Sequence, residues 1–272
     1  MERKTFIYTF VLGAGSLLFQ RKNLNAMHLN NDKTLIKMIY NNTGKCNGLI
    51  NAGGLSVWIE NEQGVTLFDA GGEASILEEN AKQLGLDFRM VKQIIISHDH
   101  WDHSGGLSMV LEKSDNKPEL YVTSNTEKQY AKDFADAHVI GVSEPLKIDE
   151  GIWSTGSFEA DYNGSLFYEH SLIISRDDSM VLITGCSHPG IVKIAKRTME
   201  IHPEKTLELI CGGFHLLREE QDTVEEISKQ LMSLGIKKIA PSHCTGDRSI
   251  EIFRKEWGKR FIDINIGDIF SA

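Results

Sequence analysis

The sequence predicts an α/β (α+β) fold in which two mixed β-sheets pack face to face and carry helices on their outer sides. Two observations lead to this prediction. Short aliphatic and β-branched runs, typical of buried strands, alternate with segments of helical periodicity. The pattern also occurs twice, because each half of the chain begins with hairpin strands and continues with strand–helix units. Residues 29–272 contain no low-complexity linker and no short repeat, so we expect a single domain.

The composition is that of a globular protein and excludes one class of partner. The chain has 272 residues, of which 41% are hydrophobic and 25% charged, and its net charge is −9. Nucleic-acid binding depends mostly on basic surfaces, so no nucleic acid is expected as the main partner. We expect a small-molecule substrate, and a local basic pocket for a small anion is compatible with this charge. The composition indicates no particular oligomeric state.

The spacing of the cysteines excludes two familiar motifs. The four cysteines are Cys46, Cys186, Cys211 and Cys244. They form no Cys-x-x-Cys pair, which excludes a zinc ribbon and a thioredoxin motif. They are also too few and too scattered for a disulfide framework.

The first residues have the features of an export signal. Arg3 and Lys4 precede an uncharged, mostly apolar run over residues 5–19, and polarity returns at Gln20. This run is short for a transmembrane helix, which needs about 20 apolar residues. We therefore expect residues 1–28 to direct export to the periplasm, and the mature protein to have no membrane span. The alternative is an apolar N-terminal segment of a cytoplasmic or N-terminally membrane-anchored protein.

Residue patterns predict the elements of the first half. Aliphatic and alternating runs predict strands at residues 34–40, 55–60, 65–69, 92–97 and 120–122. A turn at 61–64 joins the second and third of these strands as a hairpin. Helical spacing predicts helices over residues 73–84 and 106–113. Ser124 and Glu127 have the spacing of a capping box, which predicts that another helix begins there.

The second half repeats this order of elements. Strands are predicted at residues 152–155, 171–175, 180–184, 207–211 and 236–240. Helices are predicted over residues 191–200 and 222–234, and Gly235 is a typical helix stop.

The segment His98-Asp99-His100-Trp101-Asp102-His103 is the densest group of metal-binding side chains, and it follows a predicted strand directly. In an extended segment residues two apart point the same way, so His98 and His100 can bind one ion. Asp102 and His103 lie where the chain turns toward a helix and can reach a second ion beside it. Imidazole and carboxylate donors suit Zn²⁺, as one or two ions, with Fe and Mn as alternatives.

Three more histidines follow predicted strands. They are His188, His215 and His243. In layered α/β folds, ligand sites lie at one end of the strands. We therefore expect these histidines to share one edge with residues 98–103.

The His-x-His-x-Asp-His pattern of residues 98–103 resembles the signature of the metallo-β-lactamase fold superfamily. Further segments resemble, in order, the branch named after dihydropterin-6-methyl-aminobenzene-phosphate synthase. These segments are residues 66–71, 185–192, 212–216 and 241–246. The resemblance covers roughly residues 34–270. It implies a four-layer αβ/βα sandwich with a one- or two-metal site between the sheets.

The resemblance also implies metal ligands. His98 and His100 match the ligands of the first metal, and Asp102, His103 and His243 match those of the second.

One position departs from the family pattern. Cys186 stands where many members have an aspartate that bridges the metals. Either Cys186 or His188 can complete the site, or both can bind, and we favour His188. The usual third histidine of the first metal has no clear counterpart, because His170 lies close but is offset.

Other residues are assigned supporting roles. His215 is expected to contact substrate or donate a proton, with a metal ligand or a core histidine as alternatives. Asp69 is expected to orient a ligand histidine, and Asn47 and Ser56 to line the pocket.

The remaining histidines and two glycine pairs have simpler expectations. His28, His138 and His202 are expected at the surface. The pairs Gly71-Gly72 and Gly105-Gly106 precede helices, whose N-termini favour anions, although such pairs are common without a ligand.

The favoured function is that of a metal-dependent hydrolase, in which a metal-activated water attacks an ester, phosphodiester or related bond. Asp102 would orient or deprotonate this water, and His215 would protonate the leaving group. One alternative is a C–N bond-forming synthase of the pterin type, against which the export signal argues. The other is a non-hydrolytic metal-binding or sensor protein.

Overall fold

The computed structural model describes residues 34–272, except residues 43–47, 116 and 163. The export signal predicted for residues 1–28, His28 and the pocket residue Asn47 therefore lie outside the described residues. Residues 32–272 form one unit by their internal contacts.

The first of two mixed sheets has its antiparallel strands on one side and its parallel strands on the other. Its strands, in spatial order, are β15 (Ile269–Ser271), β1 (Leu35–Tyr40), β2 (Ser56–Asn61), β3 (Gly64–Phe68), β4 (Val91–Ile95), β5 (Glu119–Thr123) and β6 (His138–Val142). Neighbours from β15 to β3 pair antiparallel, and neighbours from β3 to β6 pair parallel.

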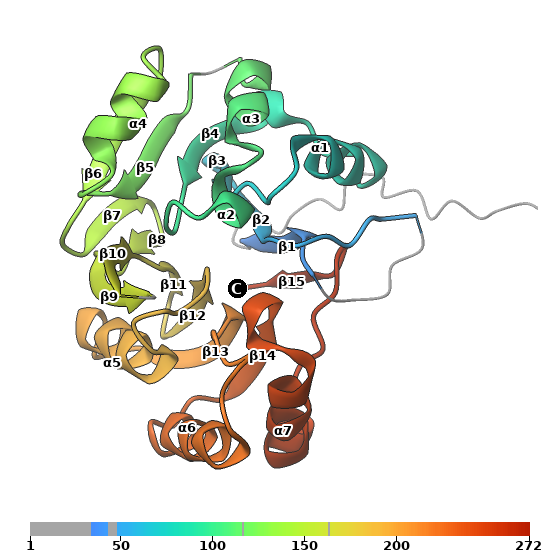
Figure 1. Ribbon diagram of the computed structural model, residues 1–272, viewed down its shortest axis with the longest axis vertical. Coiled ribbons are helices and arrows are strands. Elements are labelled where there is room, and N and C mark those ends of the chain that lie inside the picture. Colours follow the sequence, from blue (N-terminus) through green and yellow to red (C-terminus); the bar gives the residue numbers. More distant parts are fainter. Residues whose placement is uncertain (1–33, 43–47, 116, 163) are drawn as a thin grey trace, which may run out of the picture. The chain divides into compact units, whose positions relative to one another are not determined.

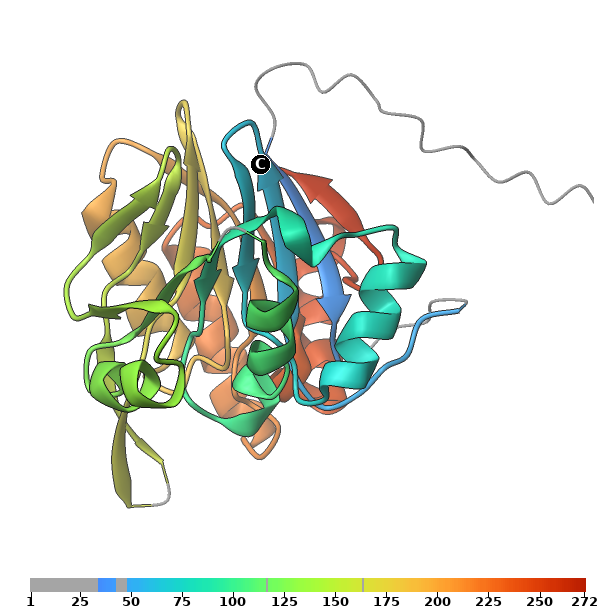
Figure 2. The same ribbon diagram turned by 90° about the horizontal axis from the view of Figure 1, so that it is seen from above.

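The second sheet is also mixed. Its strands, in spatial order, are β14 (Lys238–Ser242), β13 (Thr206–Gly213), β12 (Ser179–Thr184), β11 (Leu172–Arg176), β8 (Ile152–Ser154) and β7 (Leu146–Asp149). β14, β13 and β12 pair parallel, and the other neighbours pair antiparallel. β9 (Phe158–Tyr162) and β10 (Ser165–Glu169) form a separate hairpin, which projects from the body in Figure 2 and which we call the arm.

Helices cover the outer faces of both sheets (Figure 1). The first sheet carries α1 (Ala74–Gln83), α3 (Leu107–Lys113) and α4 (Glu127–Asp133), and the short α2 (Trp101–Ser104) follows β4. The second sheet carries α5 (Ile191–Ile201), α6 (Gln221–Ser233) and α7 (Asp247–Trp257). Single 3₁₀ turns complete the elements, at Phe88–Met90, His243–Thr245 and Gly258–Arg260.

Three apolar clusters fill the three interfaces between these layers. The cluster between the sheets includes Ile36, Val57, Phe68, Ile174 and Ile183. The cluster between the first sheet and its helices includes Trp58, Leu67, Leu77, Ile94 and Leu107. The cluster between the second sheet and its helices includes Leu182, Ile194, Ile210, Val224 and Phe253. Successive residues of a strand face opposite sides, which is why neighbours such as Leu67 and Phe68 belong to different clusters. The predicted four-layer sandwich is confirmed.

Helix α5 illustrates how the sequence determines a layer. Its buried residues are Ile191, Ile194, Ala195 and Thr198. This spacing of three and four residues places them on one face of a helix, against the second sheet. The intervening basic residues, among them Lys193 and Lys196, are exposed on the other face.

The described elements include several that the sequence did not predict. The strands β6, β7, β9, β10 and β15 and the helix α7 were missed. All five of these strands lie at a sheet edge or in the arm: β6 and β15 at the edges of the first sheet, β7 at an edge of the second, and β9 and β10 in the arm. Edge strands are buried on fewer sides and mix polar with apolar residues, so they lack the continuous apolar run of a central strand.

Two smaller predictions were wrong. The capping box at Ser124 and Glu127 does not form, because α4 begins at Glu127 with Thr126 as its N-cap and no side-chain cap bond. His202 is buried rather than exposed, since its ring packs edge to face on Trp153 at 5.1 Å. His138 is exposed, as expected.

The longest helix in the described part of the chain is α6, with 13 residues. None of the helices in this part of the chain combines the length and the apolarity that a bilayer crossing requires.

Replacing Phe253 tests whether α7 is held by its packing on the second sheet. Phe253 is fully buried and meets Phe214 edge to face at 5.6 Å. Phe253→Ala should lower the free energy of unfolding by about 3–5 kcal/mol, because it removes buried surface and leaves a cavity. Urea unfolding followed by circular dichroism measures this. Lys255→Ala on the exposed side of the same helix should cost less than about 0.5 kcal/mol. Equal losses in the two variants would contradict the assigned packing.

Candidate metal centre

Four strand ends meet at one edge of the sandwich, and each is followed by a non-glycine residue in the left-handed region. Asp69, Ser187, His215 and His243 have φ values of 60°, 66°, 54° and 50°. They follow β3, β12, β13 and β14 respectively. Such conformations cost about 1–3 kcal/mol each, persist only where their surroundings enforce them, and cluster at functional sites. The sharp turns bring the side chains that follow these strands back toward the shared edge.

The first group of donors, called here the first triad, joins the ends of β4 and β12. It consists of His98, His100 and His188. His98 Nε2 lies 3.1 Å from His100 Nδ1. The ring of His188 lies 4.9 Å from that of His98 and 5.1 Å from that of His100. One nitrogen from each residue lies within 4.8 Å of the others, so a single ion can contact all three.

The second triad lies beside the first and consists of Asp102, His103 and His243. The Nε2 atoms of His103 and His243 are 3.1 Å apart. Asp102 Oδ2 lies 3.4 Å from His243 Nε2 and 3.7 Å from His103 Nε2. These three donors also converge on one point. Asp102 and His103 lie in α2, after β4 of the first sheet, and His243 follows β14 of the second.

Cys186 lies between the two triads. Its Sγ is 3.3 Å from His103 Nε2 and 3.4 Å from His243 Nε2, and it lies within 4.8 Å of a nitrogen of His98. The sequence left open whether Cys186 or His188 completes the site. In the fold both are present, His188 in the first triad and Cys186 between the triads.

A buried carboxylate, Asp69, holds one side of this arrangement. It accepts hydrogen bonds from the Ser97 amide at 2.7 Å, the Ser97 hydroxyl at 2.8 Å and His103 Nδ1 at 2.6 Å. Because the Ser97 hydroxyl donates to Asp69, its oxygen accepts from His98 Nδ1, which is 2.9 Å away. Asp69 thus orients His103 directly and His98 through Ser97.

A second buried carboxylate, Glu169, holds the other side. It accepts the backbone amides of Cys186, Ser187 and His188 at 2.7–2.9 Å, and His188 Nδ1 at 2.9 Å. Although burial favours the neutral acid, these hydrogen bonds and the nearby imidazole lower the pKa of Glu169. The carboxylate is therefore ionised and fixes the loop that follows β12.

Asn42 completes this set of supports. Its Oδ1 accepts from His243 Nδ1 at 2.9 Å and from the Gly54 amide at 2.8 Å. Four histidines, His98, His103, His188 and His243, therefore each direct Nδ1–H at an oxygen outside the cluster. Their Nε2 atoms face the centre, the side on which a metal ion would bind.

The electrostatics of the second triad favour a positive charge. Burial disfavours a charged imidazole, yet the Asp69 carboxylate raises the pKa of His103 to about 9. Burial would raise the pKa of Asp102, but its hydrogen bond with His243 and the charge of His103 lower it below its usual value. Imidazole, carboxylate and thiol donors around such a point match the coordination chemistry of a divalent ion such as zinc.

The Cys186 thiol is a donor whose charge depends on its surroundings. Burial and the neighbouring Cys244 raise the pKa of the Cys186 thiol well above its usual value. A raised pKa favours the neutral thiol. A bound divalent cation would favour the thiolate instead, because a coordinating thiol loses its proton.

His215 and Cys244 lie beside the first triad. The ring of His215 is 4.1 Å from that of His188, and a hydrogen bond with Cys244 raises the pKa of His215. A nitrogen of His215 also lies within 4.8 Å of donor atoms of Cys186 and His188. This position fits a proton donor or a substrate contact, and it is compatible with a metal contact.

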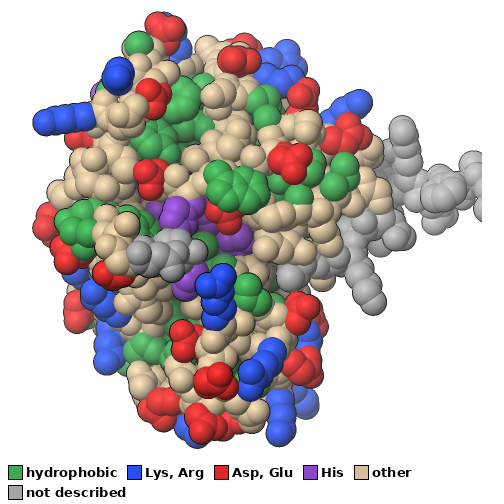
Figure 3. All heavy atoms as spheres, in the orientation of Figure 1, with side chains coloured by type: hydrophobic (Ala, Val, Ile, Leu, Met, Phe, Trp, Pro, Cys, Tyr) green, Lys and Arg blue, Asp and Glu red, His purple; other side chains and the backbone are tan. Residues whose placement is uncertain are grey.

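The cluster opens on one face of the molecule, where Figure 3 shows histidine side chains at the centre with hydrophobic side chains around them. Phe167 of the arm stacks on the ring of His100 at 5.2 Å and meets His188 edge to face at 4.7 Å. Three large hydrophobic side chains that are close in sequence to residues of the centre are exposed. They are Trp101, Leu166 and Leu217.

Three other sequence-based suggestions have structural explanations. His170 is buried, with Nδ1 2.8 Å from the Ser154 hydroxyl and Nε2 2.9 Å from the Ile96 carbonyl, so it is offset from both triads as expected. The Ser56 hydroxyl donates to the Asp69 carbonyl at 2.7 Å and is fully buried. A Cβ at Gly105 would lie 2.0 Å from the Gly72 carbonyl oxygen, so close packing of two loops explains these glycines.

Sequence reasoning missed several residues of the centre. They are Asn42, Ser97, Phe167, Glu169 and Cys244. Glu169 stands directly before His170, but only the fold shows that it reaches the loop after β12. Cys244 follows His243, and a cysteine next to a proposed ligand was a signal that could have been weighed.

A model of the metallo-beta-lactamase superfamily matches residues 51–199. Among curated proteins, the chain is 26% identical to 7,8-dihydropterin-6-methyl-4-(beta-D-ribofuranosyl)-aminobenzene-5'-phosphate synthase of Methanocaldococcus jannaschii, over 79% of this chain and 88% of that protein. It is 28% identical to an uncharacterized protein of the same organism, over 72% of this chain and 85% of that one.

Some solved structures resemble the fold of this chain. Tm1679, a metal-dependent hydrolase of the beta-lactamase superfamily, has a TM-score of 0.73 at 27% identity and covers 88% of this chain and 99% of its own. The metallo-beta-lactamase fold protein YhfI from Bacillus subtilis has a TM-score of 0.61 at 15% identity, over 89% of this chain and 100% of its own, which shows the fold alone. The family model covers more than half of the sequence, and this chain therefore belongs to the metallo-beta-lactamase superfamily.

Proposed function

We propose that this protein is a dinuclear metal-dependent hydrolase that cleaves an ester, phosphodiester or related bond with water. The observation that carries the proposal is the pair of adjacent donor triads with Cys186 between them. Membership of a superfamily whose members are generally metal-dependent hydrolases supports the same reaction class.

Zinc is the proposed metal. The first ion would be held by His98, His100 and His188, and the second by Asp102, His103 and His243. Cys186 would contact the second ion or bridge the two. A thiolate among imidazoles favours zinc over manganese, which prefers oxygen donors, and iron is the remaining alternative.

Two residues are assigned direct roles in the reaction. When bound, such ions supply an activated water and polarise the bond under attack. Asp102 keeps its negative charge, because its pKa is lowered, and it can accept a hydrogen bond from the attacking water. His215 has a raised pKa and can donate its proton to the departing oxygen.

A second candidate is a C–N bond-forming synthase of the pterin type. The observation that favours it is the 26% identity with the Methanocaldococcus jannaschii synthase. Such a reaction joins the amine nitrogen to the methyl carbon of the pterin, and with an alcohol substrate the hydroxyl group and the amine proton leave together as water. Incubation of the purified protein with a dihydropterin alcohol and a ribosylated aminobenzene phosphate distinguishes the two, because a new pterin adduct in the mass spectrum appears only for a synthase.

The proposed reaction is tested with metal-loaded protein and a panel of phosphodiesters, thioesters, lactones and β-lactams. At least one class should be hydrolysed, and His100→Ala should lower both the bound metal, measured by elemental analysis, and turnover. His138→Ala, at an exposed histidine of β6, should leave both unchanged. Full turnover in His100→Ala would rule out the assigned site.

Cobalt substitution tests the role of Cys186. A thiolate bound to Co²⁺ gives a charge-transfer absorption band in the near ultraviolet, and a free thiol does not. Cys186→Ser should remove this band. Cys211→Ser should keep it, because Cys211 is buried between the sheets and burial raises its pKa to about 12.

Cys244 is the informative control in the cobalt experiment. Its Sγ lies 3.5 Å from the Cys186 carbonyl and near the same centre. Loss of the band in Cys244→Ser with retention in Cys186→Ser would transfer the assigned contact from Cys186 to Cys244.

His215→Gln tests the proton donor. For esters with alkoxide leaving groups, kcat should fall about 10²–10⁴-fold, the usual contribution of a general acid. For 4-nitrophenyl esters the loss should be small, because 4-nitrophenolate leaves without a proton. Steady-state kinetics with the two kinds of substrate measure the difference. Equal losses for both would show that His215 acts in some other way.

A further inference from the structure

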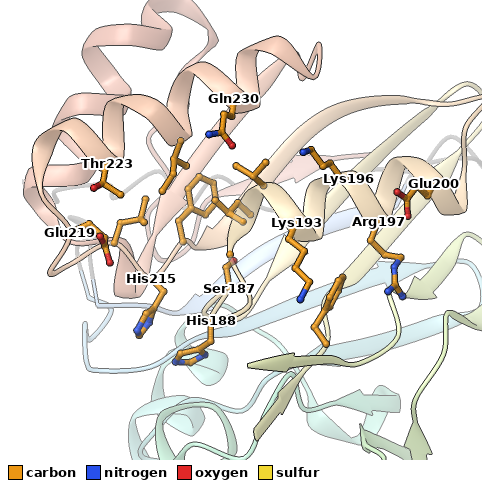
Figure 4. A pocket seen from close by; sticks show the side chains of 17 residues that line it. Ser187, His188, Lys193, Lys196, Arg197, Glu200, His215, Glu219, Thr223 and Gln230 are labelled. Carbon is orange, nitrogen blue, oxygen red and sulfur yellow. The ribbon is translucent and has the colours of Figure 1, made fainter. Parts of the chain in front are cut away.

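A cavity of about 710 Å³ extends from the proposed metal centre between α5 and α6 (Figure 4). Ser187, His188 and His215 line one end of it. Residues of the two helices line the rest. Because His188 and His215 belong to both the centre and the cavity, a molecule that reacts at the centre can extend into this space.

One wall of the cavity is apolar. It includes Phe158, Ile191, Phe214, Leu216 and Ile227. Phe158 lies in β9 of the arm, and the others lie on or beside the second sheet and its helices. This wall suits an aromatic or aliphatic part of a ligand, whose transfer from water is favourable by about 25 cal/mol per Å² of apolar surface.

Two cations converge on this wall. Lys193 Nζ lies 5.5 Å and Arg197 Cζ lies 4.8 Å from the centre of the Phe158 ring. They are separated by one turn of α5. In Figure 4 both side chains point downward, Lys193 nearer to His188 and Arg197 at the end of the cavity away from His215. Lys196 also lines the cavity, but it points the other way, toward α6.

In the described part of the chain, no carboxylate pairs with these cations. Within residues 34–272 as described, neither Lys193, Lys196 nor Arg197 forms an ion pair within 4.0 Å. Two carboxylates line the cavity, Glu219 near His215 and Glu200 beyond Arg197, and neither pairs with a cation of α5. A chain with a net charge of −9 thus concentrates unpaired positive charge beside its proposed reaction centre.

We propose that this cavity is a subsite for a negatively charged part of the substrate. An apolar segment would lie along Phe158 and Phe214, and its phosphate or carboxylate group would be bound by Lys193 and Arg197. The proposal deepens the proposed hydrolase function, on which it rests, because it names the substrate class: an ester or related compound with an anionic group distant from the bond that is cleaved. Arg197 suits such a group in particular, because a guanidinium can donate two parallel hydrogen bonds to it.

Matched esters test the subsite in kinetics. The 4-nitrophenyl monoester of suberic acid carries a free carboxylate, and its methyl-capped counterpart is neutral. Wild-type protein should hydrolyse the anionic ester with a kcat/KM about tenfold higher, as expected for about 1.4 kcal/mol of charge-assisted binding. Lys193→Gln/Arg197→Gln should abolish this preference through KM, with kcat kept. Gln retains helix propensity, so α5 is expected to stay intact.

Lys196→Gln is the matched control, since it removes one charge from the same helix without touching Phe158. It should keep most of the preference. An unchanged preference in the double variant, or an equal loss in Lys196→Gln, would overturn the proposal. The first result would show that the cations do not bind the ester, and the second that only the overall charge matters.

Calorimetric titration tests the proposed anion subsite even if the protein hydrolyses no ester. Phenylphosphonate, phenylacetate and neutral benzyl alcohol serve as probes of the metal-loaded protein. The double variant should lose about tenfold in affinity for at least one anion, and the benzyl alcohol titration should not change. The anion that loses more identifies phosphate or carboxylate as the preferred group. Anion binding that is identical in all variants would mean contact with the metals alone and would reject the subsite, whereas anion binding without turnover would reject only the hydrolase.

Discussion

The structure around the centre depends on two buried carboxylates, Asp69 in the first half and Glu169 in the second. A buried carboxylate is costly unless several donors satisfy it. Each here accepts backbone amide donors and one histidine Nδ1, and Asp69 also accepts the Ser97 hydroxyl. Asp69 thereby fixes His103 of the second triad, and Glu169 fixes His188 of the first. The two halves of the sandwich thus supply one anchor each, and the distance between the triads follows from the way in which the sheets pack.

The sequence was most informative where burial is most complete. Central strands such as β4 and β12 contain aliphatic runs, and their ends marked His98 and His188 correctly as neighbours of one edge. The choice between Cys186 and His188 could not be made from the sequence. It depends on the left-handed turn at Ser187, which separates the directions of the two side chains. Turn conformation at a non-glycine residue has no reliable sequence signal.

Residues that act through other residues were also hard to predict. Glu169 ends a strand of the arm, and its hydrogen-bond partners lie 17–19 positions further along the chain. Asn42 and His243 are 201 positions apart. Only the packing of the two sheets brings such pairs together. The helix over residues 191–200 was predicted, but the relation of its basic residues to the centre follows from the cavity that α5 and α6 enclose.

The arm has a further consequence for how such a protein can change over time. It forms its own two-stranded sheet and takes no part in either large sheet. Phe167 on one of its strands covers the histidines, and Phe158 on the other lies beneath the cations of α5. The tip of this hairpin can therefore change in length and sequence without shifting the register of either large sheet, whereas its base must keep Glu169, which holds His188. In the proposed hydrolase, one hairpin would thus serve two purposes: its variable tip would face the substrate, and its fixed base would hold a metal-binding histidine in place.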